Sequence, residues 1–237
     1  MSNSKLWLVV PAAGIGQRMQ AECPKQYLRI DSRFILDITL SRVLDSADFT
    51  GCMVPLNPAD TWWPTTEASQ DARIQTCEGG AERADSVLAA LHALAGQASD
   101  DDWVLVHDAA RPCVHPDDLT NLIATLAGHP VGGLLAAPVA DTLKKAEPGD
   151  QPEVQATVDR RPLWRALTPQ MFRYSALRTA LEKALAAGQP VTDESSALEF
   201  SGAVSGTMPL LVEGRPDNIK VTVPADLDLA GFILSRF

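Results

Sequence analysis

Short apolar runs bounded by loop-forming residues alternate with stretches of helical periodicity along most of this chain. Leu6–Val10 and Trp103–Val106 are such runs, typical of strands buried on both faces of a sheet. Apolar residues recurring at i, i+4, i+7, i+8 and i+11 between Leu36 and Ala47 predict a helix packed on that sheet. Because parallel strands need crossover connections, the alternation predicts an α/β fold, a mostly parallel sheet with helices on both faces.

The same patterns predict the remaining elements. Further strands are expected at 51–56, 73–77, 134–139, 208–212 and 219–221, and further helices over 84–95, 119–126, 177–185 and from 225 onward. Residues 57–71 are mostly polar, and adjacent tryptophans, Trp62 and Trp63, interrupt them. We expect irregular structure there, in a variable surface segment without an assigned role.

Residues at about 139–163 break the rhythm. Two short segments, 142–145 and 154–158, flank Glu147–Pro152, whose proline, glycine and aspartate are turn chemistry between strands. A two-stranded arm inserted in a single domain is therefore expected. Since an isolated ribbon is marginally stable, a partner subunit is the natural surface for it to pack against.

Composition excludes several classes of protein. The 237 residues are 46% hydrophobic, enough for one substantial core. The net charge of −10 repels polyanions and argues against nucleic-acid binding. No apolar stretch reaches the roughly 18 residues of a membrane span, and none resembles a signal peptide, so a cytoplasmic location is expected. The cysteines lack zinc or redox spacing and are expected to be reduced thiols: Cys23, Cys52, Cys77 and Cys113.

The loop Pro11–Met19 follows the first expected strand, where α/β proteins bind phosphates through backbone N–H groups. A dinucleotide fingerprint would need glycine at Met19 and an acid near Asn57, and a P-loop would need G-K-[ST], so both are disfavoured. Two cations, Arg18 and Lys25, suit a triphosphate, whose transfer depends on positioning and charge neutralisation. Their alternative interpretation is as ordinary surface cations.

Three more clusters could carry chemistry. Gly79–Ser86 begins an expected helix, whose N–H groups could hold a base, ribose or phosphate, or could simply start the helix. Asp108 follows a buried strand, where ligands bind and where one carboxylate can hold Mg²⁺ together with substrate phosphates. Its neighbour His107 is interpreted as a hydrogen-bonded structural histidine. Lys220, in an expected strand, needs an anion or a carboxylate, for which Asp217 is the nearby candidate.

A series of motifs, in order, resembles the 2-C-methyl-D-erythritol 4-phosphate cytidylyltransferase family over nearly the whole chain. The series is P-A-A-G-I-G-Q-R-M at 11–19, C-P-K-Q at 23–26, G-G-A-E-R-A-D-S at 79–86, V-H-D-A-A-R-P at 106–112, A-P-V-A-D-T at 137–142, T-V-D-R at 157–160, L-T-P-Q at 167–170, T-D-E-S at 192–195 and E-G-R-P-D-N-I-K-V at 213–221.

The resemblance implies a Rossmann-like nucleotidyltransferase fold, a β-arm that interlocks a homodimer, CTP as co-substrate and Mg²⁺ as cofactor. Cytosine and ribose would be held by Ala12, Ala13, Gly14, Gly16, Gly80, Ala81 and Ser86, in a pocket that Arg83 helps to shape. The phosphates would face Arg18, Lys25 and Lys220, and Asp108 would contact Mg²⁺ at the substrate. The acceptor would be gripped by Arg111, Thr168 and Thr192, with Thr142 and Arg160 from the partner's arm. Relatives often carry aspartate at Ala81, where a backbone N–H contact would tolerate alanine.

The implied reaction is attack by the acceptor's phosphate oxygen on the α-phosphorus of CTP, as a step of non-mevalonate isoprenoid synthesis. A phosphate monoester is already anionic, so no general base is needed. Two alternatives stay open: transfer to another polyol phosphate such as ribitol 5-phosphate, and a catalytically silent nucleotide-binding protein. The joint presence of cations and a carboxylate, Arg18, Lys25, Asp108 and Lys220, speaks against the silent protein.

Overall fold

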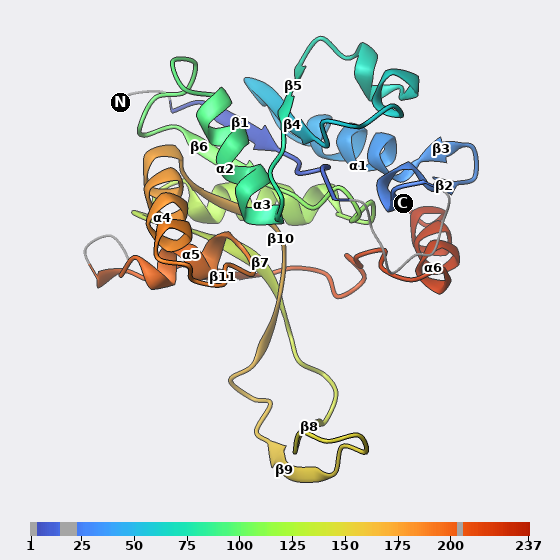
Figure 1. The fold of residues 1–237 in the computed structure, drawn as a ribbon, viewed down its shortest axis with the longest axis vertical. Helices are drawn as coiled ribbons and strands as arrows, with labels where there is room; N and C mark the ends of the chain where they lie inside the picture. The colour runs from blue at the N-terminus through green and yellow to red at the C-terminus, as the bar shows by residue number, and fades with distance from the viewer. Residues whose placement is uncertain (1–3, 15–22, 203–205) are drawn as a thin grey trace.

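A seven-stranded sheet forms the centre of the molecule, and helices cover both of its faces (Figure 1). The computed structural model describes residues 4–14, 23–202 and 206–237. The strands of the central sheet are β1 (Leu6–Val9), β4 (Gly51–Leu56), β5 (Ile74–Glu78), β6 (Trp103–Val106), β7 (Gly132–Pro138), β10 (Trp164–Arg173) and β11 (Leu210–Glu213). Their order is β11-β7-β10-β6-β1-β4-β5, and β10 alone among them runs antiparallel to its neighbours. The predicted mostly parallel sheet is confirmed.

The helices divide between the two faces of the sheet. They are α1 (Ile35–Leu44), α2 (Arg83–Ala93), α3 (Pro116–Leu126), α4 (Tyr174–Ala186), α5 (Glu194–Phe200) and α6 (Ala225–Leu234). Successive side chains of a strand point to opposite faces: Leu8 packs in the core with α1 and α3, whereas Trp7 and Val9 pack with α2, α4 and α5. A smaller cluster joins α6 to the hairpin of β2 (Arg29–Ile30) and β3 (Arg33–Phe34).

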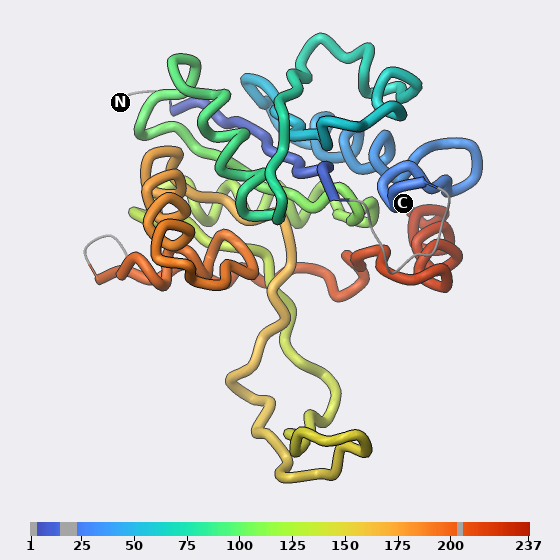
Figure 2. The backbone as a smooth tube through the Cα atoms, in the orientation of Figure 1, coloured from blue at the N-terminus to red at the C-terminus, as the bar shows by residue number. Residues whose placement is uncertain are grey.

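The predicted arm is present as an antiparallel pair of short strands, β8 (Leu143–Ala146) and β9 (Val154–Val158). The chain leaves the sheet at the end of β7 and returns through β10, so that the pair stands away from the body of the molecule (Figure 2). The arm therefore starts at the carboxyl edge of the parallel strands, where ligands bind in such sheets.

One strand of the central sheet was not predicted, and one predicted strand is absent. No prediction was made for β10, in which Pro169 lies; proline within a run argues against a central strand, and the register of β10 against β7 shifts between Ala166 and Gln170, around that proline. Conversely, no strand forms at 219–221. There the N–H of Val221 donates to the carbonyl of Ala110 at 2.8 Å, a single bond rather than a ladder.

The other predicted features have clear outcomes. Residues 57–71 are irregular apart from two single turns, η3 (Trp63–Thr65) and η4 (Ala68–Gln70). Cys52, Cys77 and Cys113 are free thiols, and Cys52 and Cys113 are buried. In the described part of the chain, every helix is too short or too polar to cross a membrane.

Candidate active site

Two adjoining pockets open at the carboxyl edge of the parallel strands. The first, about 260 Å³, is lined by the loop after β1, the turn at Lys25, the start of α2 and the loop after β6. The second, about 210 Å³, is lined by Arg111, by residues 166–168 and 170 of β10 and by the two residues before α5. Arg83, Asp108 and Lys220 line both. The two pockets therefore meet at a cluster of charged side chains.

Side-chain amides hold the backbone of the loop after β1. Gln26, 3% exposed, donates from Nε2 to the carbonyls of Ala12 at 2.6 Å and Gly14 at 3.1 Å. Asn57 donates from Nδ2 to the carbonyl of Ala13 at 3.3 Å. Three successive carbonyls are thus engaged inside the protein, which leaves the shape of this loop little freedom. The sequence did not single out Gln26 or Asn57, although Gln26 belongs to the C-P-K-Q motif.

The start of α2 packs so closely on this loop that it requires glycine. A Cβ on Gly79 would lie 2.5 Å from the Cβ of Ala13 in this loop, and one on Gly80 would overlap the Cβ of Asp85 in the first turn of α2. The buried hydroxyl of Ser86 accepts the N–H of Gly80 at 3.1 Å. The N-terminus of α2 is therefore held against the first pocket, where its dipole favours negative charge.

Three cations surround one buried carboxylate. Asp108 is 6% exposed; its Oδ1 lies 2.9 Å from Arg83 Nε, and its Oδ2 lies 2.9 Å from Lys220 Nζ and 3.2 Å from Arg111 Nε. Burial by itself raises the pKa of Asp108, but the charges of Arg83, Lys220 and Arg111 outweigh it and hold that pKa far below its usual value. Lys220 therefore pairs with Asp108. The suggested partner Asp217 was wrong, because Asp217 binds Arg215 at 2.7 Å.

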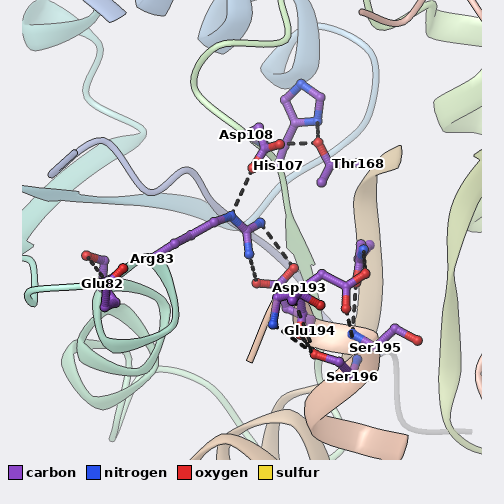
Figure 3. A network of polar contacts seen from close by, with 12 residues as sticks. Glu82, Arg83, His107, Asp108, Thr168, Asp193, Glu194, Ser195 and Ser196 are labelled. Atoms are coloured by element: carbon purple, nitrogen blue, oxygen red, sulfur yellow. Dashed lines mark hydrogen bonds and ion pairs between the residues drawn. The ribbon is translucent and has the colours of Figure 1, made fainter. Parts of the chain in front are cut away.

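Arg83 reaches across the site to a second buried carboxylate, Glu194 (Figure 3). Its Nη1 and Nη2 lie 2.6 and 3.2 Å from the two oxygens of Glu194, which is 1% exposed. Burial by itself lowers the pKa of Arg83, but the negative charges of Glu194 and Asp108 together have the larger effect and raise that pKa above its usual value, so the guanidinium stays charged. This fork geometry orients Arg83 strongly.

Glu194 is placed by the start of α5, which β10 anchors. Gln170 accepts the N–H of Ser195 at 2.9 Å and donates to Asp193 Oδ2 at 2.9 Å. No role was predicted for Glu194 or Gln170, although both stand in matched motifs, T-D-E-S and L-T-P-Q. A glutamate beside a helix start is ordinarily interpreted as a favourable first-turn charge, so nothing in the sequence alone pointed to a buried ion pair.

His107 is the structural histidine that the sequence predicted. It is fully buried; its Nε2 donates to the carbonyl of Arg111 at 3.0 Å, and its Nδ1 accepts from the Thr168 hydroxyl at 3.0 Å. That hydroxyl oxygen in turn accepts the N–H of Asp108 at 3.1 Å. These hydrogen bonds fix the position of the backbone at Asp108, just after the end of β6. Because the Thr168 hydroxyl donates its proton to His107, it cannot also donate to a ligand.

The burial of His107 predicts a pH-dependent stability. Desolvation lowers the pKa of His107 to about 4, whereas an unfolded histidine titrates near 6.5. The native state therefore binds fewer protons than the unfolded state between these values, and stability falls as the pH falls through them. We expect a loss of about 3 kcal/mol between pH 6.5 and pH 4. Urea denaturation in metal-free buffer would measure it, and His107→Gln should flatten the slope in this window; an unchanged slope would contradict the assignment.

The other predicted site residues fall into four groups. Those in the first pocket are Ala12, Ala13, Gly14, Lys25, Gly80, Ala81 and Ser86. Those in the second are Arg111, Thr168 and Thr192. Thr142 and Arg160 are exposed on the arm and line neither pocket. Gly16 and Arg18 lie outside the described residues.

Comparison with known proteins identifies the family. The family model for 2-C-methyl-D-erythritol 4-phosphate cytidylyltransferase matches residues 6–236. A protein of that name from Ectopseudomonas mendocina (strain ymp) is 54% identical over 95% of this chain and 94% of its own length, and one from Hahella chejuensis (strain KCTC 2396) is 47% identical over 100% and 95%.

Solved structures agree. The 2-C-methyl-D-erythritol 4-phosphate cytidylyltransferase of Francisella tularensis is similar with a TM-score of 0.81 and 34% identity, covering 97% of this chain and 100% of its own. That of Thermus thermophilus is similar with a TM-score of 0.78 and 30% identity, covering 98% and 100%. With the family model extending from β1 to the residues after α6, this chain belongs to the 2-C-methyl-D-erythritol 4-phosphate cytidylyltransferase family.

Proposed function

We propose that this protein transfers CMP from CTP to 2-C-methyl-D-erythritol 4-phosphate and releases pyrophosphate, in the non-mevalonate route to isoprenoids. The observation that carries the proposal is the meeting of the two pockets at Arg83, Asp108 and Lys220. An enzyme that joins two anionic reactants needs two binding sites whose phosphates meet beside cations. Family membership supplies the identity of the two reactants.

The first pocket suits the nucleotide. Its walls offer backbone groups of the loop after β1 and of Gly80 and Ala81, which can read a base edge without a long side chain. Lys25 and Lys220 lie on the same pocket, where the triphosphate would run. Alanine at position 81 fits this arrangement, because only a backbone contact is needed there.

The second pocket suits the acceptor. Arg111 lies within it, charged and mostly buried, and the side chain of Thr192 lies at its exposed side. A phosphate oxygen of the acceptor would attack the α-phosphorus, forming one P–O bond while the bond from that phosphorus to the oxygen shared with the β-phosphate breaks. Lys25 and Lys220, with Arg18, would neutralise charge as it moves onto the leaving pyrophosphate.

A divalent metal fits the site only in the company of phosphates. Within the described ranges, no group of three His, Cys, Asp or Glu side chains could hold a metal ion by itself. The carboxylate of Asp108 offers about four lone-pair positions, and three cations already contact it. Asp108 would therefore hold Mg²⁺ only together with water and substrate phosphates, which supply the other ligands that this ion takes in proteins. There Mg²⁺ would neutralise phosphate charge.

The arm would complete the acceptor pocket of a partner in a cytoplasmic homodimer. Thr142 and Arg160 line neither of the two pockets of their own chain, and the arm begins beside the site. We expect Arg160→Ala and Lys220→Ala to be inactive separately, and their equimolar mixture, after exchange of subunits, to regain about a quarter of wild-type activity through mixed dimers. A mixture that stays inactive although the subunits exchange would contradict an arm that works in trans.

The direct test offers CTP, ATP, GTP and UTP to the protein, each with methylerythritol phosphate and with ribitol 5-phosphate, in the presence of Mg²⁺. Release of pyrophosphate is expected with CTP and methylerythritol phosphate at a rate well above every other pair. Faster turnover with ribitol 5-phosphate would reassign the acceptor. CTP binding without turnover of any pair would favour the silent nucleotide-binding protein.

A further inference from the structure

The polar segment after β4, which includes the adjacent tryptophans, contacts the turn that carries Lys25. That turn is a single 3₁₀ turn, η2 (Lys25–Tyr27), and it ends in a tyrosine that is 1% exposed. The hydroxyl of Tyr27 donates to Asp60 Oδ2 at 2.7 Å. The ring of Trp62 stacks on the ring of Tyr27, with centroids 6.1 Å apart and planes 21° apart.

Asp60 ties these contacts together. Its other oxygen, Oδ1, accepts the backbone N–H groups of Trp62 at 2.8 Å and Trp63 at 2.9 Å. One carboxylate therefore fixes both the ring that covers Tyr27 and the hydroxyl at its end. Burial and the neighbouring Asp60 raise the pKa of Tyr27, so the phenol remains a hydrogen-bond donor at every working pH.

The same segment also contacts the other wall of the first pocket. Asn57, where the segment begins, donates to the carbonyl of Ala13. Its own carbonyl accepts the N–H of Asp60 at 2.9 Å, so the contacts to the two walls are joined through the backbone. Gln26 then links the walls directly, because it precedes Tyr27 and donates to Ala12 and Gly14.

We infer that residues 57–63 form a brace that holds the nucleotide pocket in its binding shape, with Asp60, Trp62 and Tyr27 as positioning residues for Lys25 and Gln26. The inference rests on the proposed use of this pocket by CTP. None of these contacts involves a residue that lines the second pocket. The brace should therefore govern affinity for the nucleotide and leave affinity for the acceptor phosphate unchanged.

The test compares three changes that keep the fold. Tyr27→Phe removes one hydrogen bond and keeps the buried ring, Trp62→Ala removes the stacked ring of a residue that is 38% exposed to solvent, and Trp62→Phe keeps an aromatic ring. We expect the Kd of CTP, measured by calorimetry with Mg²⁺, to rise about three- to tenfold in the first two variants. It should stay within about twofold of wild type in Trp62→Phe, because an aromatic ring still stacks on Tyr27.

Two controls separate a local brace from general loosening. Phe232→Ala removes another exposed aromatic ring, on α6 away from this pocket, and should leave the Kd of CTP unchanged. The KM of the acceptor should stay constant in all variants while the KM of CTP rises in Tyr27→Phe and Trp62→Ala. Asp60→Ala combined with Tyr27→Phe should weaken CTP binding by less than the product of the two single effects, because both remove the same bond.

The outcomes distinguish this inference from the proposed function. If wild type binds CTP and Tyr27→Phe and Trp62→Ala bind it equally well, the brace is overturned and the proposed function stands. If the KM values of both substrates rise together, the segment stabilises the whole domain and is no brace for one pocket. If wild type does not bind CTP, both the proposed function and the inference are overturned.

Discussion

Lys220→Ala is expected to lower kcat for cytidylyl transfer by about 10²- to 10³-fold, the cost of removing one preorganised charge donor from a reaction centre. Lys220 Nζ lies 2.9 Å from Asp108 at the junction of the two pockets, the place where charge would shift from the α-phosphorus to pyrophosphate. Pyrophosphate release under saturating CTP and acceptor would measure the loss in kcat.

Stability should change little in the same variant, because the side chain of Lys220 is 33% exposed and Asp108 keeps two arginine partners. Lys183→Ala, which removes an exposed lysine from the last turn of α4, is the matched control and should retain full activity. Lys220→Arg keeps the charge but not the position and should fall between them. Near-normal turnover of Lys220→Ala would remove this residue from the mechanism.

Glu194→Ala is expected to lower the free energy of unfolding by about 3 to 5 kcal/mol, because it leaves one partner of a buried ion pair behind. Arg83 would keep only its bond to Asp108, and the free end of its guanidinium would point into a space built for a carboxylate. Turnover should fall as well, since Arg83 lines both pockets.

Urea denaturation of the wild type and the variant would measure this change. The matched control is Glu182→Ala on α4, whose carboxylate pairs with His92 at the surface; its effect should stay within about 1 kcal/mol. A double-mutant cycle with Arg83→Ala should show strong coupling between Glu194 and Arg83. Additive losses would mean that the pair contributes nothing as a pair.

Much of the site followed from local patterns because the carboxyl ends of parallel strands meet at one edge. The loop after Val9 and the loop after Val106 were both predicted there, and both line the first pocket. Lys220 was correctly marked as a lysine that needs an anion, although its expected strand and its expected partner were wrong. The need of Lys220 for a negative partner could be inferred from its apolar sequence neighbours, whereas the partner itself, Asp108, lies far away in the sequence.

β10 and α5 show where local reasoning fails. β10 carries Pro169 and begins with three exposed residues, so its place between β6 and β7 depends on neighbours distant in sequence. Gln170 of this strand then anchors the start of α5, and with it Glu194. Each of these residues has an ordinary local context and acquires its role only through a contact made across the sheet.

The order of apolar runs and glycine-rich loops in the sequence determined the α/β architecture, the arm and the loops that surround the nucleotide pocket, because backbone periodicity and turn chemistry act over a few residues. The tertiary structure alone decided which charges meet. Four separate segments supply the charged residues of this cluster, Arg83, Asp108, Glu194 and Lys220. Burying a charge is unfavourable, and the penalty is offset only when folding brings the opposite charge within about 3 Å.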